Sequence, residues 1–128
     1  MCDLRERVYS TYPYLVLPEK TFRIKAGTTR PTLRAFVYSK AETFGDSLPL
    51  ELAGLYISFT LYNKDGFPVF SSPAYISNLD NSEIEYIWRE TDLITPGLYY
   101  GEFKFKDLDE SIFILPDSPA YRLQIAVH

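Results

Sequence analysis

The chain has 128 residues, of which 46% are hydrophobic and 16% aromatic, and its formal net charge is −4. A chain of this length forms one domain with a real core, and its apolar content excludes an intrinsically disordered protein. No run of Lys or Arg occurs, so the sequence does not indicate a nucleic-acid-binding surface. The single cysteine, Cys2, excludes an intrachain disulfide, and no apolar stretch is long enough to span a bilayer.

Residues 1–19 differ in composition from the rest of the chain. A charged start is followed by an aromatic and aliphatic stretch that Pro13 and Pro18 interrupt. Proline supplies no backbone donor to a β-ladder. We therefore expect an extended N-terminal arm at 1–19 and a folded domain at 20–128.

From residue 20 onward the hydrophobic pattern has a period of two, which is typical of half-buried strands. Phe22, Ile24 and Ala26, for example, alternate with Thr21, Arg23 and Lys25. Similar segments follow at 33–38, 55–62, 67–70, 74–77, 84–88, 99–105, 111–115 and 121–127. Short strands separated by regular turn signals predict an all-β fold, an immunoglobulin-like antiparallel β-sandwich of about seven to nine strands.

Three local features refine this prediction. Asn63-Lys-Asp-Gly66 is a tight hairpin signal, because Asp-Gly tolerates positive φ angles. Tyr99 follows Pro96-Gly97 at a strand start, where a tyrosine corner would tie a loop to the backbone. Trp88 is expected in the core, with a surface, sugar-stacking role as the alternative. The predicted core comprises Phe22, Ile24, Leu33, Val37, Leu55, Ile57, Phe59, Tyr86, Trp88, Tyr99, Phe103, Leu123 and Ile125.

Residues that carry chemistry are scarce. The only histidine, His128, is C-terminal, and with Cys2 it cannot complete a zinc site. Asp107, Asp109 and Glu110 share one turn that could hold Ca²⁺, although a solvated hairpin is the simpler interpretation. We therefore expect no enzyme activity, with no catalytic residue, cofactor or metal site.

The C-terminal half carries a set of spaced motifs: Ile84-Glu-Tyr-Ile-Trp88, Thr91-Asp92, Thr95-Pro-Gly-Leu-Tyr99, Gly101-Glu-Phe103, Leu115-Pro116 and Tyr121-Arg-Leu-Gln-Ile-Ala-Val127. They resemble the immunoglobulin-like N-terminal domain of phage upper-baseplate and related tail-associated structural proteins, over about residues 20–127. The resemblance implies a bacteriophage virion structural protein of the tail or baseplate, the neck or the capsid surface, assembled in the cytoplasm of a bacterial host. The implied partners are other virion proteins and copies of itself. The alternative is a carbohydrate-binding or other ligand-binding sandwich with exposed aromatic side chains.

We expect the arm to be the main binding element, because its apolar surface would be costly to leave in water. It could pair with a neighbouring subunit's sheet edge, or fold back as an extra edge strand of its own domain. Aromatic residues on the predicted outer faces are further contact candidates, and neither a nucleic acid nor a membrane is expected as a partner. The predicted partner-binding residues are Tyr9, Tyr12, Tyr14, Leu15, Val16, Leu17, Phe36, Tyr38, Tyr62 and Tyr100.

Overall fold

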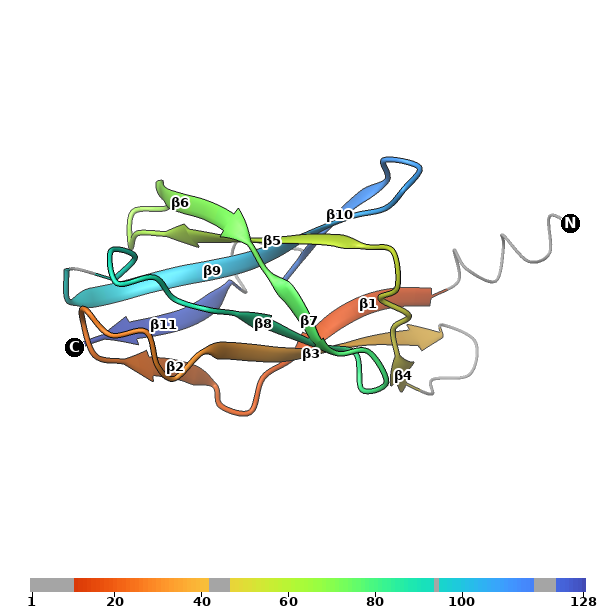
Figure 1. Cartoon of the computed structure of the whole chain (residues 1–128), viewed down its shortest axis with the longest axis horizontal. Coiled ribbons are helices and arrows are strands. Elements are labelled where there is room, and N and C mark those ends of the chain that lie inside the picture. The colour runs from red at the N-terminus through yellow and green to blue at the C-terminus, as the bar shows by residue number, and fades with distance from the viewer. Residues whose placement is uncertain (1–10, 42–46, 94, 117–121) are drawn as a thin grey trace, which may run out of the picture.

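Two β-sheets packed face to face make up the fold (Figure 1). The computed structural model describes residues 11–41, 47–93, 95–116 and 122–128, and all regular elements in these ranges are strands. The predicted all-β sandwich is therefore confirmed. Within the same ranges, no helix is long and apolar enough to cross a membrane.

The first sheet is antiparallel throughout. Its strand order is β1 (Thr11–Val16), β3 (Leu33–Ala41), β8 (Glu83–Tyr86) and β7 (Tyr75–Asn78), and β4 (Ser47–Pro49) also pairs with β3.

The second sheet contains a parallel pair, which the antiparallel pattern did not predict. Its order is β2 (Thr21–Ile24), β11 (Leu123–Val127), β9 (Gly97–Lys106), β5 (Tyr56–Tyr62) and β6 (Pro68–Pro73), and β10 (Ile112–Leu115) pairs with β9. β2 and β11 run parallel, with Thr21 opposite Gln124, and the other pairs are antiparallel. The first and last strands of this sheet in chain order are therefore neighbours.

β1 contains most of the described part of the predicted arm, residues 11–16 of 11–19. It pairs with β3 in unbroken register, from Thr11 opposite Ala41 to Val16 opposite Phe36. Residues 11–16 thus follow the fold-back alternative and form an edge strand of their own domain. Leu15 and Leu17 pack against the core, which removes apolar surface from water and explains the pairing. Pro13 fits this edge position because only one side of the strand needs donors.

The core lies between the sheets and agrees with the predicted alternation. Of the predicted residues, Phe22, Leu55 and Tyr99 are partly buried against the core, and the others are buried. Trp88 is 1% exposed and meets Phe59 and Tyr86 edge-on, at ring-centroid distances of 5.6 and 5.1 Å. Its predicted core position is confirmed, and a surface sugar-stacking role for Trp88 is excluded.

Gly101 on β9 is required by this packing. A Cβ atom at this position would lie 2.6 Å from Cε1 of Phe59 and 3.0 Å from Cδ1 of Ile125. Such distances are shorter than van der Waals contact, so the ring of Phe59 occupies the space that a side chain would need.

Loops at the ends of the sandwich are fixed by side chains. The Tyr99 hydroxyl donates to the Thr95 carbonyl at 2.8 Å, which confirms the predicted tyrosine corner. The predicted hairpin at Asn63–Gly66 is also confirmed: Asn63 Oδ1 accepts from the backbone N–H of Asp65 and of Phe67, and Gly66 has φ 88°.

A buried carboxylate anchors the loop after β8. Asp92 accepts hydrogen bonds from the Tyr86 hydroxyl at 2.6 Å and from the Arg89 backbone N–H at 2.9 Å. The Arg89 guanidinium also binds Asp92, at 3.1 Å. Burial, followed by the hydrogen bond to Asp92, raises the pKa of Tyr86 to about 12.

Candidate functional site

Two adjoining hollows lie beside the β1–β2 and β2–β3 connections. One hollow, of about 470 Å³, is lined by Leu17, Pro18, Glu19, Phe22, Arg23, Pro31, Thr32 and Arg34. The other, of about 710 Å³, is lined by Thr29, Arg30, Pro31, Thr32, Arg34, Glu85 and Ile87. Because they share Pro31, Thr32 and Arg34, we treat them as one feature, called here the arginine groove.

The floor of the arginine groove is apolar and rests on the core. Phe22 of β2 is partly buried, and its ring lies 5.9 Å from that of Trp88. Leu17 packs on the same core from the β1–β2 connection. A floor fixed to a packed interior holds its shape before a ligand binds, which reduces the entropic cost of binding.

The rim of the groove is basic, although the protein as a whole carries a net charge of −4. Arg23, Arg30 and Arg34 all have exposed positions on it. Arg34 forms an ion pair with Glu85 at 3.1 Å. Arg23 and Arg30 form no ion pair with any residue that the structure describes. Their charges are available to an anionic group.

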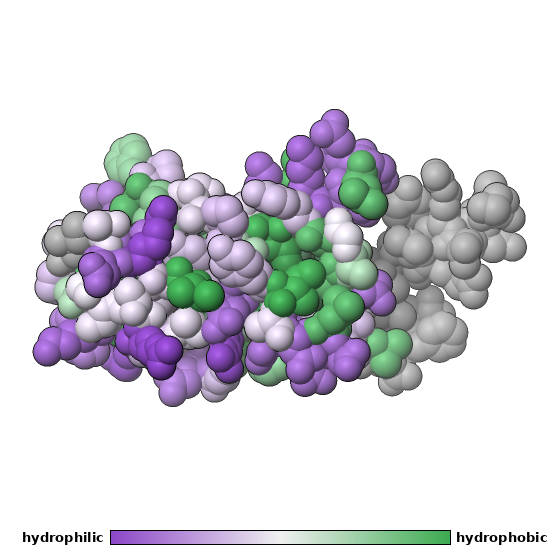
Figure 2. All heavy atoms as spheres, viewed as in Figure 1, coloured by the Kyte–Doolittle hydropathy of each residue, from purple (hydrophilic) through white to green (hydrophobic). Residues whose placement is uncertain are grey.

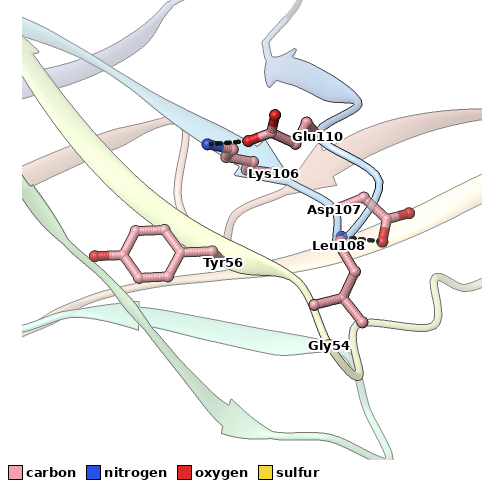
Figure 3. Close-up of a pocket in the computed structure, with 6 residues that line it drawn as sticks. All are labelled: Gly54, Tyr56, Lys106, Asp107, Leu108 and Glu110. Carbon is pink, nitrogen blue, oxygen red and sulfur yellow. Dashed lines mark hydrogen bonds and ion pairs between the residues drawn. The ribbon is translucent and has the colours of Figure 1, made fainter.

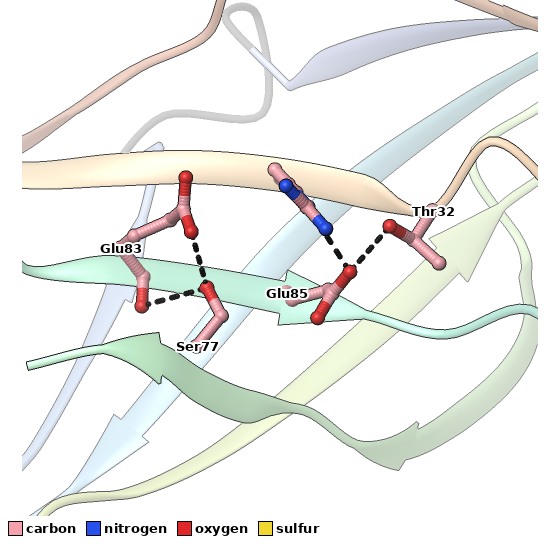
Figure 4. Close-up of polar contacts among 5 residues, drawn as sticks. Thr32, Ser77, Glu83 and Glu85 are labelled. Carbon is pink, nitrogen blue, oxygen red and sulfur yellow. Dashed lines mark hydrogen bonds and ion pairs between the residues drawn. The ribbon is translucent and has the colours of Figure 1, made fainter.

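Glu85 is held by β3 and its preceding loop (Figure 4). The Thr32 hydroxyl and the Arg34 guanidinium both donate to Glu85 Oε2. The hydrogen bond from Thr32 is the main cause that lowers the pKa of Glu85, and Arg34 adds to it. Glu83, two residues earlier, accepts a hydrogen bond from Ser77 of β7 at 2.7 Å. Because its pKa is lowered, the Glu85 carboxylate is a weak general base.

The predicted partner-binding residues do not form one site. Tyr9 lies outside the described residues, and Tyr12, Tyr14, Leu15 and Val16 belong to β1. Phe36 and Tyr38 lie on β3, in the first sheet. Tyr62 and Tyr100 are partners across β5 and β9, in the second sheet. The structure brings Tyr14 and Tyr38 together, with ring centroids 5.9 Å apart. Of the predicted residues whose side chains are described, only Leu17 lines the groove.

Tyr62 is already in contact with its own chain. Its hydroxyl donates to Glu102 Oε1 at 2.5 Å, and the Arg122 guanidinium lies 3.6 Å from its ring centroid. Arg122 also pairs with Glu102 at 3.2 Å, so the three side chains form a closed cluster. Burial is the first cause that raises the pKa of Tyr62. Because Glu102 and Arg122 already contact Tyr62, its side chain is a weaker candidate for binding a partner protein than we expected from the sequence.

Sequence reasoning missed the three arginines of the groove. They are separated along the chain, and a search for runs of basic residues does not find them. The signal that was available is strand alternation, which places Arg23 and Arg34 on the outward sides of their strands.

The acidic turn at residues 107–110 is a hairpin between β9 and β10. Among the described residues, no group of three or more His, Cys, Asp and Glu side chains is placed to hold a metal ion. Figure 2 shows that apolar residues on the viewed face gather in separate groups with polar residues around them.

Comparison with known proteins gives a fold and no family. No family model matches the chain, and no curated protein matches it. The crystal structure of CopC from Methylosinus trichosporium OB3b is similar, with a TM-score of 0.51 and 14% identity over 91% of this chain and 93% of that one. At this identity the likeness shows a shared sandwich fold alone.

This comparison overturns the expectation of a bacteriophage virion structural protein. CopC, a solved structure that matches along nearly the whole chain, is a protein of Methylosinus trichosporium OB3b and not a virion module. The reason lies in the motifs that suggested the phage family. Tyr86, Trp88 and Phe103 fill the core, and Tyr99 makes the corner, so these residues meet the needs of a sandwich and carry no information on function.

Proposed function

We propose that this chain is a non-catalytic binding module whose arginine groove takes an extended segment of another polypeptide that combines acidic and apolar side chains. The observation that carries the proposal is the combination of a fixed apolar floor with the unpaired charges of Arg23 and Arg30. An apolar floor supplies affinity, and separated guanidinium groups select carboxylates at a matching spacing.

The absence of catalysis in this proposal is supported by the chemistry of the groove. Among the described residues, Glu19 and Glu85 are the carboxylates that line it. Glu85 is held ionised by Thr32 and Arg34, and in the part of the chain that the structure describes no histidine, cysteine or serine lines either hollow. Arginine remains protonated at all physiological pH values, so Arg23 and Arg30 attract negative charge without transferring protons.

Fluorescence anisotropy with short labelled peptides tests the proposal. Peptides that alternate Asp or Glu with Leu or Phe are expected to bind, and peptides with Lys in place of the acidic residues are not. Arg23→Glu should weaken binding about tenfold or more, because it replaces an attraction by a repulsion. Rising salt should weaken binding of the wild-type protein in parallel.

Lys104→Glu is the matched control. Lys104 is an exposed residue of β9 that does not line the groove, and its substitution changes the net charge by the same amount. If Arg23→Glu and Lys104→Glu weakened binding equally, the effect would come from net charge, and the groove would not be the site.

A further inference from the structure

The turn between β9 and β10 presents an apolar side chain among acidic ones. Leu108 is 87% exposed, and Asp107, Asp109 and Glu110 surround it in the sequence. Leu108 lies near the tip of a projecting hairpin, where its apolar side chain is in contact with water.

This turn has a fixed shape. Asp107 Oδ1 accepts a hydrogen bond from the Leu108 N–H, and Asp109 Oδ1 accepts one from the Ser111 N–H. Lys106 and Glu110 form an ion pair at 3.3 Å, and Figure 3 shows the Leu108 side chain directed toward Gly54. A preformed turn loses little conformational entropy when it binds.

The turn and the arginine groove are complementary. The turn offers one apolar side chain flanked by carboxylates, and the groove offers an apolar floor flanked by Arg23 and Arg30. In Figure 1 the turn projects at the upper right, whereas the β1–β2 and β2–β3 connections lie along the lower left. The two features of one molecule are therefore far apart and can meet only between molecules.

We propose that the occupant of the arginine groove is the β9–β10 turn of a second copy of this chain, with Leu108 on the apolar floor and the carboxylates of the turn near Arg23 and Arg30. This inference rests on the proposed function and names the partner. The two surfaces are different, so the contact is head-to-tail, and each copy keeps a free groove or a free turn for the next copy. The association is therefore open-ended.

The contact is small, so the dissociation constant of a single contact is expected to be on the order of 10–1,000 µM. Sedimentation velocity over a concentration series should show a weight-average mass that rises with protein concentration and falls with added salt. Leu108→Lys removes the apolar group and places a positive charge near the arginines. Arg23→Glu replaces a positive charge of the groove by a negative one, which repels the carboxylates of the turn. Each of the two variants alone should remain monomeric.

Mixing the two variants is the decisive step. Leu108→Lys keeps an intact groove and Arg23→Glu keeps an intact turn, so the mixture should form a one-to-one dimer that does not grow further. Phe67→Ala is the matched control, because Phe67 is a 66% exposed apolar residue at the β5–β6 turn. Its association should equal that of the wild-type protein. Thermal melting of each variant confirms that it is folded.

Three results would overturn the inference: a wild-type protein that stays monomeric at about millimolar concentration, a mixture that forms no dimer, or a Phe67→Ala variant that also stays monomeric. The peptide experiment separates this failure from that of the proposed function. If acidic, apolar peptides bind the wild-type groove while the protein does not self-associate, the binding function stands and the occupant is another polypeptide. If neither is observed, both proposals are wrong.

Discussion

The aromatic core and the arginine groove are adjacent regions that share strands. They differ in how many of their side chains have interaction partners within the chain. Phe59, Tyr86 and Trp88 pack ring against ring between the sheets, and each is no more than 1% exposed. In the groove, Arg23 and Arg30 have no ion-pair partner among the described residues. The core residues are constrained by stability, whereas the exposed side chains of Arg23 and Arg30 make no ion pair that would stabilise the fold. Substitutions in the core should therefore change stability, whereas substitutions of the groove arginines should change binding.

Trp88→Ala should have the largest effect. Removing this buried ring leaves a cavity beside Phe59 and Tyr86, and the free energy of unfolding should fall by about 3–5 kcal/mol. Urea denaturation measures the change. Trp88→Phe is the control: the indole N–H has no hydrogen-bond partner among the described residues, so this variant should lose less than about 2 kcal/mol. Equal losses in the two variants would mean that packing of the ring is not the cause.

Tyr86→Phe should lower stability by about 1.5–3 kcal/mol at neutral pH, because it removes a hydrogen bond to the buried carboxylate of Asp92. The folded-state pKa of Tyr86, about 12, lies above its ordinary value of 10.0. The contribution of the hydroxyl is therefore complete below about pH 10 and is lost as pH rises toward about 12. Unfolding followed from neutral to alkaline pH should show the wild-type and variant stabilities converging. A constant difference up to about pH 12 would contradict the assignment.

Gly101→Ala should destabilise the protein by about 1–3 kcal/mol, because the added methyl group overlaps the ring of Phe59. In a Phe59→Leu background, Gly101→Ala should cost less stability than it costs in the wild-type protein. A double-mutant cycle would measure this difference. Additive effects would show that the two positions do not compete for space.

Glu85→Gln should have the smallest effect on stability, below about 1 kcal/mol, since Arg34 is 56% exposed and surface ion pairs contribute little. The lowered pKa of Glu85 means that this contribution is present above about pH 4.5 and is lost as pH falls further. The same substitution frees Arg34, so peptide binding to the groove should become a few times tighter. Weaker binding would show that Glu85 itself contacts the ligand.

The core could be predicted from the sequence because strand alternation is a local signal. The period of two placed Ile57 and Phe59 inward, and the residues around Pro96-Gly97 predicted the corner made by Tyr99. The Asp-Gly pair predicted the Asn63–Gly66 hairpin. Each of these features depends on residues close together in the chain.

The groove could not be predicted because its residues come together only through sheet topology. Arg23 lies on β2, Arg34 on β3 and Glu85 on β8, and the spacing between them in sequence carries no sign of their proximity. The parallel pairing of β2 with β11 was missed for the same reason. The alternation also could not show that Arg122 covers the ring of Tyr62, because the two side chains meet only through the sheet.

The pairing of β2 with β11 also has a consequence for synthesis on the ribosome. β2 reaches its place in the second sheet only through β11, and Thr21 meets Gln124 across a separation of 103 residues. While the nascent chain grows, β2 therefore has a free edge until the eleventh strand has emerged from the exit tunnel. Contacts this distant close slowly, because the chain entropy of a long loop must be lost before any contact forms. Of the two sheets, the second should consequently be the last to complete and the one most exposed to chaperones before then.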